Sequence, residues 1–99
     1  MTPRDEQILR HIARHRLSIR PVLQQLFFKS SDAAGNVINR LVRAGMLESS
    51  KLPGGHSYYQ LTDKGAQALG LQKAPRVRDV RGVPAALAAL LSTSMEGER

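Results

Sequence analysis

The stretch from Ser30 to Gly45, SSDAAGNVINRLVRAG, places the strongest constraint on how this chain can fold. Ser30 or Ser31 can cap the start of a helix, and Gly45 can take the left-handed conformation that follows a helix end. Between these ends the apolar residues recur at helical spacing, at Ala34, Val37, Ile38, Leu41 and Val42. The stretch therefore predicts an amphipathic helix with one buried face.

The other face of this helix carries amides and arginines. Amide side chains can pair with adenine, and guanidinium groups can bind guanine or phosphate. Hydroxyl and backbone N–H groups at a helix start suit phosphate. The same side chains also suit an ordinary solvated helix face. The candidate contacts with nucleic acid on this helix are Ser30, Ser31, Asn36, Asn39, Arg40 and Arg43.

Two shorter helices are expected before this one. Thr2 can cap a helix over residues 3–15, with Asp5 completing a capping box. An isolated extended piece at 17–19 leads to a helix over 20–28, where Pro21 lies near the first helical position. A short turn over 29–31 then separates this helix from the one after it. Two helices joined by so tight a turn indicate a helix-turn-helix with a recognition helix in second place.

A hairpin is expected after Gly45, with strands at 46–51 and 56–61 around the turn Leu52-Pro53-Gly54-Gly55. Alternation would place Tyr59 and Leu61 on the core face and Tyr58 and Gln60 on the outer face. Thr62 can cap a short helix that ends near Gly70. Further candidate contacts are Lys51 and His56 beside the turn and Tyr58 on the outer face of the hairpin, although packing across the strands explains Tyr58 equally well. Less central candidates, at helix ends, are Arg4, Arg16 and Arg20.

The last part of the chain differs in composition from residues 1–71, which are expected to form one domain. Residues 72–83 are expected to be a basic linker, with a brief extended piece over 77–80. Residues 84–92, PAALAALLS, predict a short helix and a candidate dimerisation element, because its leucines have little of their own chain left to cover them. Residues 93–99 are expected to be a flexible tail.

Charge and composition narrow the function. The formal charge is +7 and the pI about 10.9, which is typical of domains that bind nucleic acid. The absence of cysteine excludes disulfides and thiolate chemistry, and it fits a reducing cytoplasm. No apolar run is long enough to span a bilayer, and the N-terminus does not resemble a signal peptide.

Catalytic and metal sites find no support in the sequence. No paired carboxylates, phosphate loop or nucleophile elbow is present, so an enzyme is not expected, and neither is a cofactor. His11 and His15 have the i, i+4 spacing that suits a metal, but no third ligand accompanies them. Two surface histidines are the expected interpretation, and no metal site is predicted.

The order of elements is that of a winged helix-turn-helix, and here a resemblance becomes specific. INRLVRAGMLES and GGHSYYQLTDKGAQAL resemble the recognition-helix end, wing and exit helix of many bacterial winged-helix regulators. YYQLTDKGAQAL is similar to the wing of PadR-type regulators. TPRDEQILRHIARHRLSIRPVLQQLFF is similar to the N-terminal winged helix of the replication-relaxation family of plasmid and mobile-element proteins. The sequence after the wing predicts no long C-terminal helix of the kind that PadR proteins use for dimerisation.

The expected fold is therefore α+β and mainly helical, a three-helix core with a two- or three-stranded wing hairpin and a short C-terminal helix. Leu26 and Leu41 are expected in the core. The expected function is sequence-specific binding of double-stranded DNA, by a homodimer, in transcription regulation or in plasmid or mobile-element control. The alternative is a protein-interaction module or an accessory subunit of a replication or mobilisation complex.

Overall fold

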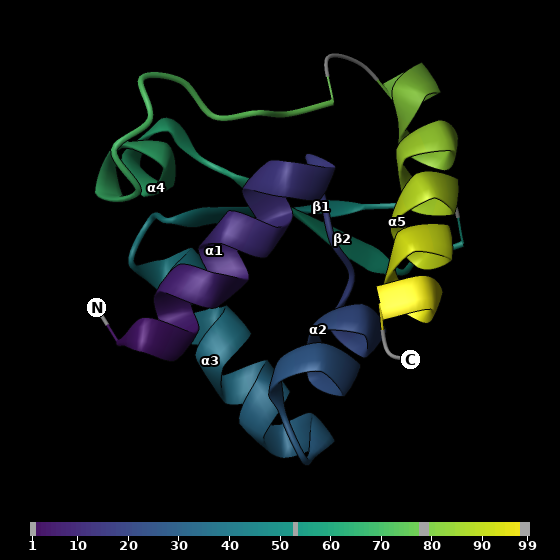
Figure 1. Ribbon diagram of the computed structural model, residues 1–99, viewed down its shortest axis with the longest axis horizontal. Coiled ribbons are helices and arrows are strands. Elements are labelled where there is room, and N and C mark those ends of the chain that lie inside the picture. Colours follow the sequence, from purple (N-terminus) through teal and green to yellow (C-terminus); the bar gives the residue numbers. More distant parts are fainter. Residues whose placement is uncertain (1, 53, 78–79, 98–99) are drawn as a thin grey trace.

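The computed structural model describes residues 2–52, 54–77 and 80–97 (Figure 1). Helices α1, α2 and α3 come first, a hairpin of β1 and β2 follows, and α4, a 3-10 turn η1 and α5 complete the described part. The bounds of these elements are Pro3–His15 (α1), Arg20–Phe27 (α2), Ser31–Arg43 (α3), Leu47–Lys51 (β1), Ser57–Leu61 (β2), Asp63–Ala68 (α4), Val80–Gly82 (η1) and Val83–Gly97 (α5).

The helix ends follow the local signals in the sequence. Thr2 and Asp5 form the expected capping box of α1, in which the Thr2 hydroxyl accepts from the Asp5 backbone N–H at 3.1 Å. Ser30 caps α3 by accepting from the backbone N–H of Ala33 at 3.2 Å. Gly45 follows α3 with φ +79°, the left-handed conformation that glycine adopts readily. The predicted starts and the predicted end are confirmed.

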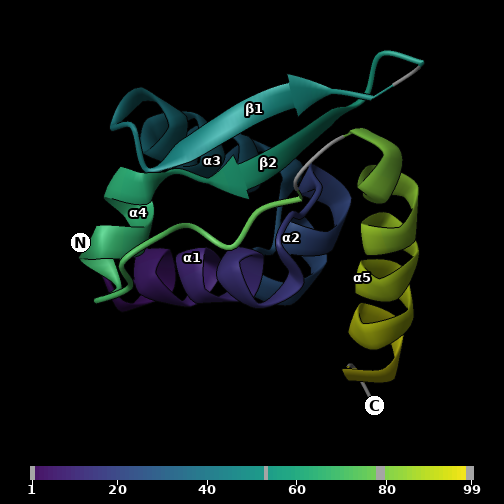
Figure 2. The same cartoon turned by 90° about the horizontal axis from the view of Figure 1, so that it is seen from above.

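The hairpin pairs its two strands antiparallel, from Leu47 opposite Leu61 at the base to Lys51 opposite Ser57 near the turn. Ser18, between α1 and α2, adds one isolated bridge to Tyr59, with two backbone hydrogen bonds of 2.8 and 2.9 Å. The sheet of the described residues is thus two-stranded, and the predicted extended piece at 17–19 is a single bridge. Figure 2 shows α1 below the base of this hairpin and α3 behind it.

The main core lies where α1, α2 and α3 meet the base of the hairpin. Leu41 is buried there, as predicted, whereas Leu26 is only partly buried and packs elsewhere. The prediction for Leu26 was wrong because Leu26 shares a face of α2 with Val22, and this face packs in a second cluster. Leu23 and Phe27, by contrast, face the main core. The buried members of the main core are Ile8, Leu9, Ile12, Leu23, Ala34, Ile38, Leu41, Leu47, Leu61 and Ala66.

The second cluster lies between α5 and the rest of the chain, with buried members Leu17, Val22, Tyr58, Val83 and Leu90. It includes the C-terminal helix that the sequence suggested for dimerisation. Of the three leucines behind that prediction, Leu90 is buried and Leu87 partly buried against the chain's own residues, whereas Leu91 is 43 % exposed. A homodimer stays a prediction. In both views α5 stands at the opposite end of the molecule from α4 (Figures 1 and 2).

The C-terminal helix is longer than expected, since α5 runs from Val83 to Gly97 rather than over 84–92. No proline or glycine interrupts the sequence between Pro84 and Gly97, so nothing in the backbone stops the helix at Ser92. Part of the tail predicted as flexible, residues 93–97, is therefore helical. Residues 98–99 lie outside the described residues.

Two residues in the described part of the expected basic linker hold it to the domain by hydrogen bonds. The Ala74 backbone N–H donates to Asp63 at 3.2 Å, and Arg76 donates to Glu48 at 2.9 Å and to Gln60 at 3.2 Å. The segment runs from α4 along the domain towards α5 in Figure 1. Of the extended piece predicted over 77–80, residues 78–79 lie outside the described residues, and Val80 begins a 3-10 turn.

Candidate nucleic-acid interface

Helix α3 separates its buried and exposed side chains cleanly. Ala34, Ile38 and Leu41 are buried in the main core, while Asn36, Asn39 and Arg43 are exposed together with Arg40. Positions three and four apart lie on one helix face, so these four side chains form a single polar surface. The structure thus brings together all four residues predicted on this helix face.

Arg40 is distinguished from the other three by a partner on α1. Its guanidinium donates two hydrogen bonds to the Asp5 carboxylate, at 2.8 and 3.0 Å. The Arg40 side chain is 56 % exposed, whereas the Asp5 side chain is 2 % exposed. Arg40 therefore neutralises a buried carboxylate, and only the outer part of its side chain faces solvent.

The charge state of Asp5 follows from these contacts. Burial of the carboxyl raises its pKa, but the hydrogen bonds from Arg40 and from the Thr2 backbone outweigh burial, so the pKa of Asp5 lies below its usual value. The same pair raises the pKa of Arg40. Asp5 is therefore ionised near neutral pH, and its ion pair with Arg40 connects the first turn of α1 to α3. The capping box identified Asp5 in the sequence, but no local signal indicated a partner 35 residues away.

The start of α3 is held by an arginine of α2. Arg20 donates from one nitrogen to the backbone carbonyl of Ser31 at 2.7 Å and to its hydroxyl at 2.9 Å. A Cβ at Gly35 would lie 2.8 Å from the same nitrogen, so glycine leaves the room that Arg20 occupies. The hydroxyls of Ser30 and Ser31 both have protein partners, and both residues are exposed.

The predicted wing contacts lie near the turn of the hairpin. Lys51 ends β1 and His56 precedes β2, and both side chains are exposed. The backbone N–H of Leu52 donates to the carbonyl of His56 at 2.6 Å, which closes the turn between them. Pro53 of the turn lies outside the described residues. The arrangement of a helix-turn-helix followed by such a hairpin is the geometry of a winged helix.

A comparison of the sequence with models of known families agrees with this geometry. The model of the winged helix DNA-binding domain matches residues 1–65. The chain belongs to this family. No curated protein and no solved structure matches the chain. The match covers α1, α2, α3, both strands and the start of α4, so the winged helix domain includes the exposed face of α3 and the wing.

One predicted contact of the winged helix domain was misplaced. Tyr58 was expected on the outer face of the wing, but it is 7 % exposed and packs in the second cluster. Alternation along β2 was predicted correctly in period, yet α5 covers the face that was taken as the outer one. Gln60, on the same face, is also buried and accepts from Arg76. Tyr58 therefore holds α5 rather than facing solvent.

The two histidines of α1 also differ from the prediction of surface residues. His11 is partly buried, its Nε2 lies 3.1 Å from the hydroxyl of buried Ser18, and its ring meets the edge of Phe27. Burial, helped by the charges of His15 and Arg14, lowers the pKa of His11 to about 4. His11 is therefore neutral near pH 7 and packs as part of the domain.

The residues that the structure describes contain no group of three or more His, Cys, Asp or Glu side chains placed to hold a metal ion. Among the described helices, none combines the length and the apolar character needed to cross a membrane.

Proposed function

We propose that this winged helix domain binds double-stranded DNA in a sequence-specific way, with α3 in the major groove. One observation carries the proposal: α3 exposes Asn36, Asn39 and Arg43 on one face while its opposite face is packed in the core. A helix fixed in this way can present amides to base edges without losing its position. The net charge of +7 supports contact with the phosphate backbone.

Different roles follow for the residues of this face. Recognition helices contact base edges mainly with their N-terminal residues, so we assign base contacts to Asn36 and Asn39 and a phosphate contact to Arg43. Arg40 is bound to Asp5 and contributes less to contact with DNA. Ser30 and Ser31 lie where a phosphate approaches a helix start, and Lys51 and His56 reach the backbone or minor groove beside it.

We infer a biological role in transcription regulation or in control of a plasmid or mobile element, as the resemblance to bacterial regulators implies. The protein acts in the cytoplasm by binding rather than by catalysis. An operator with two half-sites would require two copies of the chain.

Binding to selected and random duplexes across a salt series tests this proposal. Asn36→Ala and Asn39→Ala should each cost about 1–3 kcal/mol on the selected duplex and relax its specificity at one position. Arg43→Ala should weaken binding to all sequences alike and lower the salt slope by about one unit. Arg10→Ala is the matched control, because Arg10 is exposed on α1, outside α3 and the wing.

The outcomes separate DNA binding from the alternative function. If wild type shows no salt-dependent affinity for any duplex at low salt, the proposal fails and a protein-interaction module takes its place. If Arg10→Ala lowers the salt slope as much as Arg43→Ala, α3 is not the DNA-binding face. Circular dichroism of each variant ensures that a loss of binding is not a loss of fold.

A further inference from the structure

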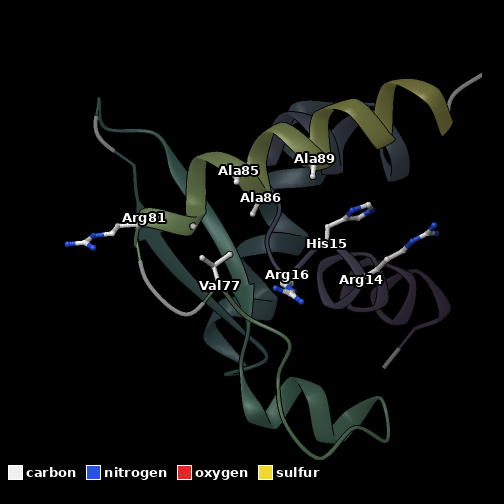
Figure 3. A pocket seen from close by; sticks show the side chains of 9 residues that line it. Arg14, His15, Arg16, Val77, Arg81, Ala85, Ala86 and Ala89 are labelled. Atoms are coloured by element: carbon white, nitrogen blue, oxygen red, sulfur yellow. The ribbon is translucent and has the colours of Figure 1, made fainter.

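A cavity of about 740 Å³ lies between the C-terminal end of α1 and the first turns of α5 (Figure 3). Three consecutive residues of α1 and its cap, Arg14, His15 and Arg16, line one side. Residues of η1 and α5 line the other side. The exposed face of α3 contributes no residue, so this cavity is separate from the DNA-binding site proposed above.

The α1 side of the cavity is positively charged. Arg14 and Arg16 are exposed, and neither forms an ion pair with any other residue that the structure describes. Burial, together with the charge of Arg14, lowers the pKa of His15. In Figure 3 the Arg14 side chain extends away from Arg16, so the Arg16 guanidinium is the nearer of the two to the alanines of α5. A guanidinium group without a carboxylate partner among the described residues favours an anion at this place.

The α5 side of the cavity is apolar. Ala85, Ala86 and Ala89 face it from successive turns of the helix, and Val77 closes its lower edge in Figure 3. Arg81 also lines the cavity, but its side chain extends away from α1 in that view. A ligand that fills the cavity would therefore meet small apolar side chains on one side and the Arg16 guanidinium on the other.

The backbone of Arg16 provides an observation independent of the cavity. Arg16 caps the end of α1 with φ +71°, and among the described residues it is the one non-glycine with a positive φ. Glycine is the favoured residue in this conformation, and other residues adopt it at a cost. The residue in this strained conformation is an arginine whose side chain lies at the cavity. Backbone strain of this kind is often retained at binding sites.

We propose that this cavity binds a small organic anion, with its carboxylate at the Arg16 guanidinium and its apolar body against the alanines of α5. Both parts of the ligand are needed, because guanidinium groups alone would accept any anion and the alanines alone would accept any apolar molecule. The site is formed by one chain and does not depend on the presence of DNA.

The test uses the full chain without DNA, with sodium 1-naphthoate as the probe and isothermal titration calorimetry as the measurement. We expect saturable binding with one ligand per chain, together with a shift of the His15 ring resonances in NMR spectra. The neutral analogue 1-naphthylmethanol and inorganic phosphate should each bind at least about tenfold more weakly, a difference of about 1.4 kcal/mol. Failure here would leave the DNA-binding proposal untouched, since that proposal is tested on duplexes.

Arg16→Gly is the decisive variant, because glycine suits the left-handed cap and the fold should be retained. It should weaken naphthoate binding about tenfold or more, whereas Arg10→Ala, a matched loss of charge elsewhere on α1, should leave it unchanged. Equal binding by Arg16→Gly and wild type would overturn the proposal. Equal binding of naphthoate and phosphate would also overturn it. The absence of naphthoate binding at millimolar concentration would do the same, and Arg16 would then serve as a helix cap only.

Discussion

Replacing Leu90 by alanine should detach α5 from the domain while the winged helix stays folded. Leu90 is fully buried in the second cluster, and Val83 is the other α5 residue buried there. Burial of each side chain stabilises by about 1.5–3 kcal/mol before the entropy of ordering the helix is subtracted. A Leu→Ala change at a buried site costs about 2–5 kcal/mol, so it removes most of what holds α5 in place.

Hydrogen exchange of backbone amides measures this loss helix by helix. In Leu90→Ala, amides of α5 should exchange close to the rate of unfolded peptide, whereas amides of α1 and α3 should keep their wild-type protection. Leu91→Ala is the matched control, since Leu91 is the next residue on the same helix and is 43 % exposed. Protection lost equally in α1, α3 and α5 would refute the reasoning, because the two clusters would then unfold as one unit.

Three further predictions follow from single contacts. Gly65→Ala should destabilise the fold by about 1–3 kcal/mol in urea unfolding, since its Cβ would lie 2.4 Å from the Met46 carbonyl oxygen; an unchanged midpoint would contradict this packing. Asp5→Asn should be less stable than wild type at neutral pH. This difference in stability should vanish as pH falls through the lowered pKa of Asp5, because the wild-type carboxylate is then protonated as well; a pH-independent difference would be evidence against the ion pair. His11 should titrate near pH 4 by NMR. Because its pKa is lower in the folded state, His11 makes the protein less stable as pH falls from 6.5 to about 4, and His11→Gln should remove this part of the loss; a His11 pKa near 6.5 would disprove its burial.

The sequence predicted local structure well where a signal is local. The caps at Thr2 and Ser30, the glycine after α3 and the period of the hairpin all depend on neighbouring residues, and the structure has each of them. The separation of core and exposed faces on α3 follows from the same helical period. These features could be predicted because side-chain spacing and backbone preference decide them before any long-range contact forms.

The features that were missed depend on contacts between distant parts of the chain. The position of Tyr58 depends on whether α5 covers the wing, and the sequence of β2 carries no sign of that helix. The pair of Asp5 and Arg40 joins residues 35 positions apart, and each is explained locally without the other. His11 was judged from helical spacing alone, whereas its burial arises from packing against Phe27 and Ser18.

The division of α3 into a packed face and a solvent face has a consequence for how such a protein diversifies. Asn36, Asn39 and Arg43 are exposed and are not members of the main core, so exchanging them should change folding stability by less than about 0.5 kcal/mol. Under the proposed function, relatives of this chain can therefore acquire new target sequences without a loss of folding stability. Arg20 and Asp5 hold α3 through hydrogen bonds to Ser31 and Arg40, so their substitution should cost stability. We expect these two residues to stay unchanged while the exposed residues of α3 are exchanged.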